Sequence, residues 1–308
     1  MESSLLPFEM RARIYWHKYR HTWIARRPDD FSGKLHWKLL KDRRPQQTMF
    51  ADRIAVRDYV ACRAGAQYLA QCHAAAADPG EIDRAALPRE FVAKPSHASG
   101  GVWIVSDDAP AEMKIVPAPD ARGPLWPGSG WNHVLVRPEA LDWDLFVETF
   151  RTLVSRNYAR RHYVEWGYLN VPPGMIVEEL LRGGDRLVPL DYKFFCFNGQ
   201  PRLIHVVDGR FAGAVTSNLY QPDWTPVEAD WPDGQSVYPH APVSAAPAAL
   251  EEMVEVATAL SRGTDFVRVD LYNLGGRIVF GELTNSPGGG IACFQPPAFD
   301  ALVGSWWD

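Results

Sequence analysis

Residues 266–290 read FVRVDLYNLGGRIVFGELTNSPGGG and predict two successive β-strands followed by a glycine-rich segment. Arg268 and Asp270 lie two residues apart and therefore share one face of the first strand, while Glu282 lies on the second. Carboxylates from two adjacent strands suit Mg2+, which takes one or two of them and completes its shell with phosphate oxygens and water. A neighbouring arginine would neutralise a phosphoryl group during its transfer. The alternative is an ion-paired antiparallel sheet.

A second candidate site lies at FVAKPSHASGG, residues 91–101. Here Lys94 stands near the end of an apolar strand, and a strand-loop-strand unit continues into VWIVS. The backbone N–H groups of such a small-residue loop can donate to phosphate oxygens, and the lysine supplies a positive charge. The loop residues with this predicted role are Ser96, Ser99, Gly100 and Gly101. The alternative is a solvent-facing lysine beside a hairpin turn.

Two further motifs place charges inside apolar strands. MIVEELL, residues 175–181, contains Glu178 and Glu179, and burying a carboxylate there is costly unless a hydrogen bond or cation compensates. Asp191 and Lys193 share a strand face in DYKFFCFNG, where they could bind a ribose hydroxyl and a phosphate or form an ion pair on a wet face. The sequence leaves these alternatives open.

Hydrophobic periodicity outlines the rest of the chain. It predicts strands at residues 175–181, 191–199 and 201–209 that succeed one another as a meander, and an apolar strand pair at the carboxyl-terminal end. Helices are predicted over residues 8–27, 52–64, 66–75, 143–158 and 247–262.

Composition indicates an ordinary globular enzyme, with 46% hydrophobic and 22% charged residues in 308 and a net charge of −5. Residues 1–63 hold 14 Lys/Arg against seven Asp/Glu, which we interpret as a solvated basic face rather than a nucleic-acid site. The four cysteines form no metal-ligand or disulfide pattern. No apolar run approaches the ~20 residues of a transmembrane segment, and we expect a cytoplasmic protein.

In this order, the motifs resemble the ATP-grasp superfamily, and within it the branch similar to TupA-like proteins of teichuronopeptide biosynthesis. The resemblance runs from about residue 30 to residue 305 and includes DDFSGKLHWKLL and FADRIAVRDYV in addition to the motifs above. It implies an α+β ATP-grasp fold, in which two lobes with mainly antiparallel sheets clasp a nucleotide. The implied parts are a mostly helical region at 1–85, a small lobe at 86–170 and a large lobe at 171–308.

The resemblance also implies roles for individual residues. Lys94 would contact the α- and β-phosphates, and the loop of residues 96–101 would close over the β- and γ-phosphates. Arg268 would steady the γ-phosphoryl group. Glu178 and the backbone of Glu179, Leu180 and Leu181 would line the adenine slot. Asp191 would bind the ribose hydroxyls, and Lys193 would lie near the phosphates. Magnesium would bind Asp270 and Glu282. Arg53 stands where the family pattern has a phosphate-binding lysine, and at the last metal position the sequence Glu282-Leu283-Thr284-Asn285 favours Asn285 over Thr284.

The implied activity is an ATP- and Mg2+-dependent ligase that joins a small carboxylate to an amine through an acyl phosphate. A kinase that phosphorylates a hydroxyl, or a nucleotide-binding protein without turnover, would carry the same motifs. Acceptor contacts are expected within residues 103–170, which include Trp103, Trp126, Trp131, His133 and Arg137, and within residues 210–218. A homodimer is compatible with the sequence.

Overall fold

A computed structural model describes residues 7–21, 28–117, 132–156, 158–161, 164–184, 187–209, 215–232 and 237–308. Four helices come first along the described chain: α1 (Phe8–Arg20), α2 (Phe31–Lys41), α3 (Pro45–Ala51) and α4 (Ala55–Arg63). The side chain of Asp30 caps α2 by accepting a hydrogen bond from the Gly33 backbone N–H at 2.7 Å. None of the described helices combines the length and apolar character that crossing a bilayer would require.

The first sheet has six strands in the order β1-β6-β2-β3-β5-β4. These strands are β1 (Cys72–Ala76), β2 (Phe91–Pro95), β3 (Trp103–Val105), β4 (Lys114–Val116), β5 (His133–Val136) and β6 (Met175–Glu178). All neighbours are antiparallel except β3 and β5. The amphipathic helix α5 (Trp143–Val154) buries Phe146, Phe150 and Leu153 in the core of this sheet.

The second sheet is antiparallel throughout, in the order β10-β9-β8-β7-β11-β12. It consists of β7 (Asp191–Phe197), β8 (Gln200–Asp208), β9 (Thr216–Tyr220), β10 (Pro226–Val227), β11 (Phe266–Leu274) and β12 (Arg277–Thr284). Helix α7 (Leu250–Ser261) packs on one face, and the aromatic cluster around Phe31 of α2 packs on the other together with α8 (Pro297–Gly304). The short helix α6 (Tyr158–Arg161) lies between α5 and β6 in the chain.

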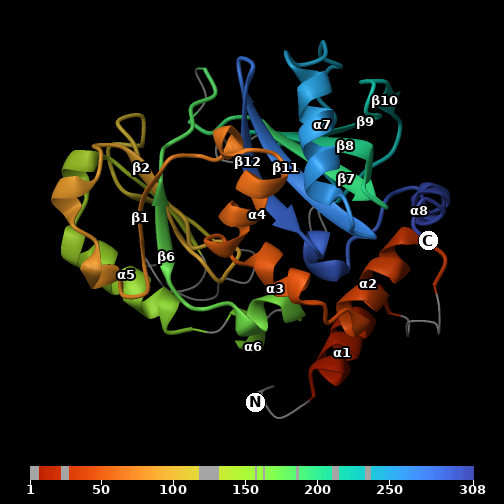
Figure 1. Ribbon diagram of the computed structural model, residues 1–308, viewed down its shortest axis with the longest axis horizontal. Helices are drawn as coiled ribbons and strands as arrows, with labels where there is room; N and C mark the ends of the chain where they lie inside the picture. Colours follow the sequence, from red (N-terminus) through yellow and green to blue (C-terminus); the bar gives the residue numbers. More distant parts are fainter. Residues whose placement is uncertain are drawn as a thin grey trace.

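The two sheets lie side by side, with α3 and α4 between them (Figure 1). Phe50, Val56 and Val60 of these helices join the core of the second sheet, while Arg57 of α4 reaches Glu178 of β6 in the first. Two mainly antiparallel sheets, each with its own core, confirm the predicted α+β class.

Two sequence predictions were wrong. The helix expected at 66–75 is a 3₁₀ turn at Ala66–Tyr68 followed by strand β1, because pairing with β6 overrides the helical propensity of the alanine run. Residues 175–178 do not belong to the meander, since β6 lies between β1 and β2 in the first sheet. That sheet therefore draws strands from both sides of residues 86–170, and the chain passes to the second sheet between β6 and β7.

Candidate nucleotide site

A row of charged side chains crosses one face of the second sheet. Glu282 of β12 lies opposite Asp270 of β11, which in turn lies opposite Lys193 of β7. Lys193 Nζ lies 2.6 Å from Asp270 Oδ2 and 2.9 Å from Asp191 Oδ2. Alternation of side chains along each strand brings these residues, which are far apart in the sequence, onto one face.

Arg268 links the row to the end of β12. Its Nε and Nη2 donate to the two oxygens of Asp270 at 2.6 Å each, and Nη2 also donates to Glu282 Oε1 at 2.8 Å. Thr284 Oγ1 accepts from the same Nη2 at 3.0 Å and donates to Glu282 Oε1 at 2.7 Å. Burial alone would lower the pKa of Arg268, but Asp270 and Glu282 raise it, so the buried guanidinium stays charged.

A second charged group stands on the first sheet. Glu178 Oε2 accepts from Lys94 Nζ at 2.9 Å, and Glu178 Oε1 accepts from Arg57 Nη1 at 2.6 Å. Burial would raise the pKa of Glu178, but the two cations outweigh it and hold the pKa below its usual range. Arg53 is nearby, since its Nη1 donates to the carbonyl of Pro95 at 2.6 Å.

The charged group of the first sheet and Glu282, the end of the row on the second sheet, line one pocket between the sheets. Glu282 enters from β12, Lys94 and Glu178 from the first sheet, and Arg53 and Arg57 from the α3–α4 segment. The remaining lining is mainly apolar: Phe50, Ala51, Val56, Tyr168, Phe280, Gly281 and Leu283. Three cations on a partly apolar wall are what a phosphate-bearing ligand with a flat, apolar base requires.

A second pocket adjoins the first and shares Ala51, Tyr168 and Leu283 with it. Its polar lining includes Asp42, Glu165, Asn285 and Ser286. Burial and, to a lesser extent, Glu282 raise the pKa of Glu165 against the opposing effect of Arg268, and together they bring it to about 8. At neutral pH the Glu165 carboxyl is therefore largely protonated when nothing is bound beside it.

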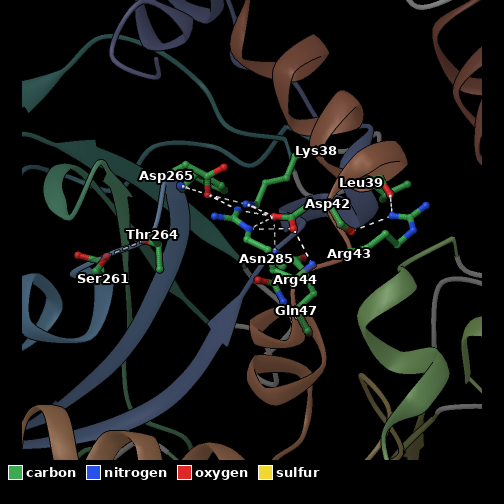
Figure 2. A network of polar contacts seen from close by, with 11 residues as sticks. Lys38, Leu39, Asp42, Arg43, Arg44, Gln47, Ser261, Thr264, Asp265 and Asn285 are labelled. Carbon is green, nitrogen blue, oxygen red and sulfur yellow. Dashed lines mark hydrogen bonds and ion pairs between the residues drawn. The ribbon is translucent and has the colours of Figure 1, made fainter.

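A network of ion pairs holds the wall of this second pocket (Figure 2). Lys38 Nζ bridges Asp42 Oδ2 at 2.7 Å and Asp265 Oδ1 at 2.6 Å, and Arg44 pairs with the same two carboxylates. Gln47 Nε2 donates to Asp42 Oδ2 at 3.0 Å, and the carbonyl of Gln47 accepts from Asn285 Nδ2 at 3.0 Å. The network thereby ties α2 and α3 to the start of β11 and to the segment after β12.

The sequence from residue 33 to residue 307 matches the family described as TupA-like ATPgrasp. The chain belongs to the TupA-like ATP-grasp family. No curated protein matches it. Among solved structures, D-alanine–D-alanine ligase from Bacillus anthracis is similar, with 14% identity over 78% of this chain and 58% of that chain and a TM-score of 0.41. The ATP-grasp ligase PsnB in complex with minimal precursor has 10% identity over 83% of this chain and 60% of that chain, with a TM-score of 0.37. This TupA-like chain thus spans less than two thirds of the length of either protein.

The structure of this TupA-like ATP-grasp protein brings together the predicted residues Arg53, Lys94, Glu178 and Glu282 around one pocket. Arg268, Asp270, Asp191 and Lys193 form the ion-paired row that continues from Glu282. Their assignment to particular atoms of ATP stays a prediction. The ion-paired sheet that was the alternative for this motif is also present, because Asp270 is 1% exposed and both of its oxygens are bonded to cations.

The loop after β2, residues 96–101, has a buried part and an exposed part. Ser96 is fully buried and lines neither pocket. Its hydroxyl donates to the Pro172 carbonyl at 3.1 Å and its backbone N–H to the Gly174 carbonyl at 2.8 Å, and its phosphate role stays a prediction. Ser99 is exposed, and Gly100 and Gly101 have φ of 88° and 68°, a backbone conformation that favours glycine. The exposed part of the loop therefore begins at Ser99.

Glu179, the residue directly after β6, forms polar contacts that the sequence did not specify. Glu179 pairs with Arg277 of β12, and its backbone N–H donates to the Gln71 carbonyl at 2.9 Å. Glu179 thus joins the two sheets rather than facing the pocket. Leu180 and Leu181 are half-buried in the connection from β6 to β7, and their adenine role stays a prediction.

At the predicted metal position, the hydroxyl of Thr284 bonds Glu282, whereas Asn285 turns its amide to the Gln47 carbonyl and lines the second pocket. This placement favours Thr284 over Asn285 as the neighbour of Glu282. In the described part of the chain, no group of three or more His, Cys, Asp or Glu residues is arranged to hold a metal ion.

Sequence reasoning missed Arg57, Glu165 and Tyr168. Arg57 lies on α4, and Arg53 lies two residues before that helix. Their spacing of four residues within the helix predicted at 52–64 could have indicated a second cation. Glu165 and Tyr168 lie next to and within a short 3₁₀ segment at Trp166–Asn170 that has no sequence pattern of its own.

The expected acceptor region is only partly described. Trp103 is 1% exposed and packs edge-to-face on Phe146, so it belongs to the core of the first sheet and not to a substrate site. Arg137 donates to the Ala109 carbonyl at 2.8 Å. Trp126, Trp131 and residues 210–214 lie outside the described residues.

Proposed function

We propose that the protein is an ATP- and magnesium-dependent ligase that forms an amide from a carboxylate and an amine. The observation that supports this proposal best is the pocket shared by Lys94, Arg53, Arg57, Glu178 and Glu282, to which residues from both sheets contribute. Membership of the TupA-like ATP-grasp family agrees with a nucleotide in this pocket.

In the proposed reaction, the substrate carboxylate attacks the γ-phosphorus of ATP to give an acyl phosphate and ADP. The neutral amine then attacks the acyl carbon, the bond from that carbon to the phosphate oxygen breaks, and the proton lost by the amine goes to the released phosphate. No protein nucleophile is needed, so this chain contributes position and charge. Lys94 and Arg53 would hold phosphate oxygens, and Arg268 would stabilise the charge that develops on the transferred group.

Magnesium, when bound, would neutralise phosphate charge. Glu282 suits it, because this side chain is 41% exposed toward the pocket and only its Oε1 has a hydrogen bond among the described residues. Asp270 suits it less well, since Arg268 and Lys193 engage both carboxylate oxygens. We therefore propose Glu282 as the principal carboxylate, with Asp270 beside it.

The test incubates the protein with ATP, magnesium and pooled amino acids or uronic acids in the presence of hydroxylamine, which traps an acyl phosphate. Formation of a hydroxamate together with ADP would support the ligase. A stable phosphoester would instead establish the kinase that we retain as the second candidate. ATP binding without any turnover would identify a nucleotide-binding protein, and absence of ATP binding would refute all three.

A further inference from the structure

The two adjoining pockets differ in charge. Three cations, Arg53, Arg57 and Lys94, line the first pocket, which we call the nucleotide pocket after its proposed function. The second pocket, which we call the acidic pocket, is lined by Leu39, Asp42, Gln47, Ala51, Glu165, Trp166, Gly167, Tyr168, Leu283, Thr284, Asn285 and Ser286. Its described lining contains two carboxylates and no lysine, arginine or histidine. A ligand of the acidic pocket is therefore expected to carry positive charge.

Three oxygen atoms in the acidic pocket are available as hydrogen-bond acceptors. Asn285 Oδ1 is buried and accepts no hydrogen bond among the described residues, although its amide nitrogen is used by Gln47. Ser286 is 6% exposed, and its hydroxyl has no partner in the same described set. The carboxyl of Glu165 likewise makes no side-chain hydrogen bond to a described residue. A buried acceptor without a donor is costly, so a ligand that supplies N–H groups would remove that cost.

Two of the charges near Glu165 are already paired with opposite charges. Asp42 is bound by Lys38, Arg44 and Gln47, and Arg268 is bound by Asp270 and Glu282. Glu165 is therefore the carboxylate of this pocket that remains for a ligand. Trp166 and Tyr168 add aromatic side chains, which attract cations, although Arg43 already stands 5.1 Å from the centre of the Trp166 ring.

We infer that the acidic pocket binds the ammonium group of the second substrate, with Glu165 as its counter-ion and Asn285 Oδ1 and Ser286 Oγ as hydrogen-bond acceptors. An ammonium group has three donors, which matches the three oxygens. This inference rests on the proposed function, because it gives the amine of the ligase reaction a place next to the nucleotide pocket. The shared residues Ala51, Tyr168 and Leu283 form the boundary across which the neutral amine, after the ammonium has given a proton to the Glu165 carboxylate, would reach the activated carboxylate.

The experiment uses ethylammonium chloride as the probe and ethanol, of similar size but without positive charge, as its control. The readout is the indole N–H resonance of Trp166 in a protein labelled with 15N at tryptophan, assigned with Trp166→Phe. The variant is Glu165→Gln, which keeps the shape of the side chain and removes its charge. The matched control is Glu139→Gln, whose carboxylate is 56% exposed and pairs with Arg89 near the first sheet.

We expect ethylammonium to shift the Trp166 resonance saturably in the wild type and in Glu139→Gln, with at least tenfold weaker binding in Glu165→Gln. Equal binding by Glu165→Gln, equal binding of ethanol, or no saturable shift in the wild type would overturn the inference. The comparison of ethylammonium with ethanol needs only the wild-type protein, so it tests the inference even if Glu165→Gln does not fold.

Titration of the same samples with magnesium and ATP separates this inference from the proposed function. Loss of the ammonium site with ATP binding retained would reject the amine pocket and leave the ligase intact. Ammonium binding without ATP binding would reject the ligase and leave a cation site.

Discussion

At the scale of single residues, Lys94 and Glu178 define the nucleotide pocket from the side of the first sheet. The Lys94 side chain is 27% exposed, so it keeps access to a ligand while Glu178 holds it in position. Arg57 forms an ion pair with the other oxygen of Glu178 and would keep that carboxylate paired if Lys94 turned toward phosphate. Glu178 therefore positions the Lys94 ammonium, which can still bind a phosphate oxygen.

Lys94→Ala is expected to weaken ATP binding by about 10- to 100-fold, because a hydrogen bond to a charged group contributes roughly 1.5–3 kcal/mol. The thermal unfolding midpoint should stay near that of the wild type, since Arg57 still pairs with Glu178. Isothermal titration calorimetry and a thermal melt check both points. Arg89→Ala, which removes an exposed cation far from the pocket, is the control. Unchanged ATP affinity in Lys94→Ala would remove this residue from the nucleotide site.

Glu165→Gln should make the protein more stable at high pH. The pKa of Glu165 in the folded protein is about 8 against an ordinary 4.5, so between pH 4.5 and 8 the folded state binds a proton that the unfolded state does not. The stability conferred by the protonated Glu165 is therefore fully present below pH 4.5, falls as pH rises from 4.5 to 8, and is absent above pH 8. The variant cannot ionise, and its midpoint should exceed that of the wild type at pH 8.5 but not at pH 5. Calorimetry at both values decides, and a pH-independent difference would contradict the reasoning.

At the scale of elements, β11 and β12 hold charges with two different functions. Asp270 lies inside a buried ion-pair network, whereas Glu282 at the same cross-strand position reaches the pocket. Removing one partner of a buried pair leaves its cations uncompensated. Asp270 thus contributes to stability as well as to any ligand.

Replacing Asp270 or Glu282 by the corresponding amide should accordingly have different effects on stability and on magnesium binding. Asp270→Asn is expected to lower the free energy of unfolding by about 3 kcal/mol, because it leaves Arg268 and Lys193 short of a buried counter-ion. Glu282→Gln should leave stability within about 1 kcal/mol, since its side chain is 41% exposed, but should abolish the effect of magnesium on ATP affinity. Urea unfolding and titrations with and without magnesium measure these effects. An exchange of the two outcomes between the variants would show that the metal lies at Asp270.

A buried histidine of helix α2 leads to a separate prediction, which concerns how the stability of the protein depends on pH. His36 is fully buried, its Nδ1 lies 3.3 Å from the Gly290 carbonyl, and burial lowers its pKa from 6.5 to about 4. Between pH 6.5 and 4 the unfolded chain binds a proton that the folded chain does not, so stability falls as pH falls through this window. The loss from this one group is up to about 3 kcal/mol, and none of it occurs above pH 6.5.

Urea unfolding at pH 7.5, 6 and 5 measures this slope. His36→Gln should flatten it, whereas His240→Gln, which changes a half-exposed histidine, should not. If the slope of His36→Gln equals that of the wild type, the buried imidazole is not its cause.

The strands that carry chemistry were predictable from the sequence because their period-two alternation is strong. The pairing of β7 with β8 through the Asn198–Gly199 turn and of β11 with β12 follows such patterns. Strand β1 was not predictable, since its alanines favour a helix and only β6 makes them a strand. Glu165 was also inaccessible to sequence reasoning, because its role depends on Asn285 and Ser286, which join it only in the folded chain.

At the scale of the whole molecule, the nucleotide pocket depends on both sheets. Lys94 and Glu178 come from the first sheet, Glu282 comes from the second, and α3 and α4 lie between them (Figure 1). The ion pair between Glu179 and Arg277 is a further direct link between the sheets. A ligand that touches both sheets should therefore stabilise their association, and with it the whole fold.

Magnesium and ATP together are accordingly expected to raise the unfolding midpoint. At a ligand concentration 100 times the dissociation constant, binding contributes about 2.7 kcal/mol. With an unfolding entropy of about 2.1 cal/mol/K per residue, a chain of this length should gain roughly 4 °C. Lys94→Ala should gain much less at the same concentration, because its affinity is lower, whereas Arg89→Ala should respond as the wild type does. Differential scanning calorimetry measures the shift, and a rise of equal size in Lys94→Ala would mean that ATP binds elsewhere than between the two sheets.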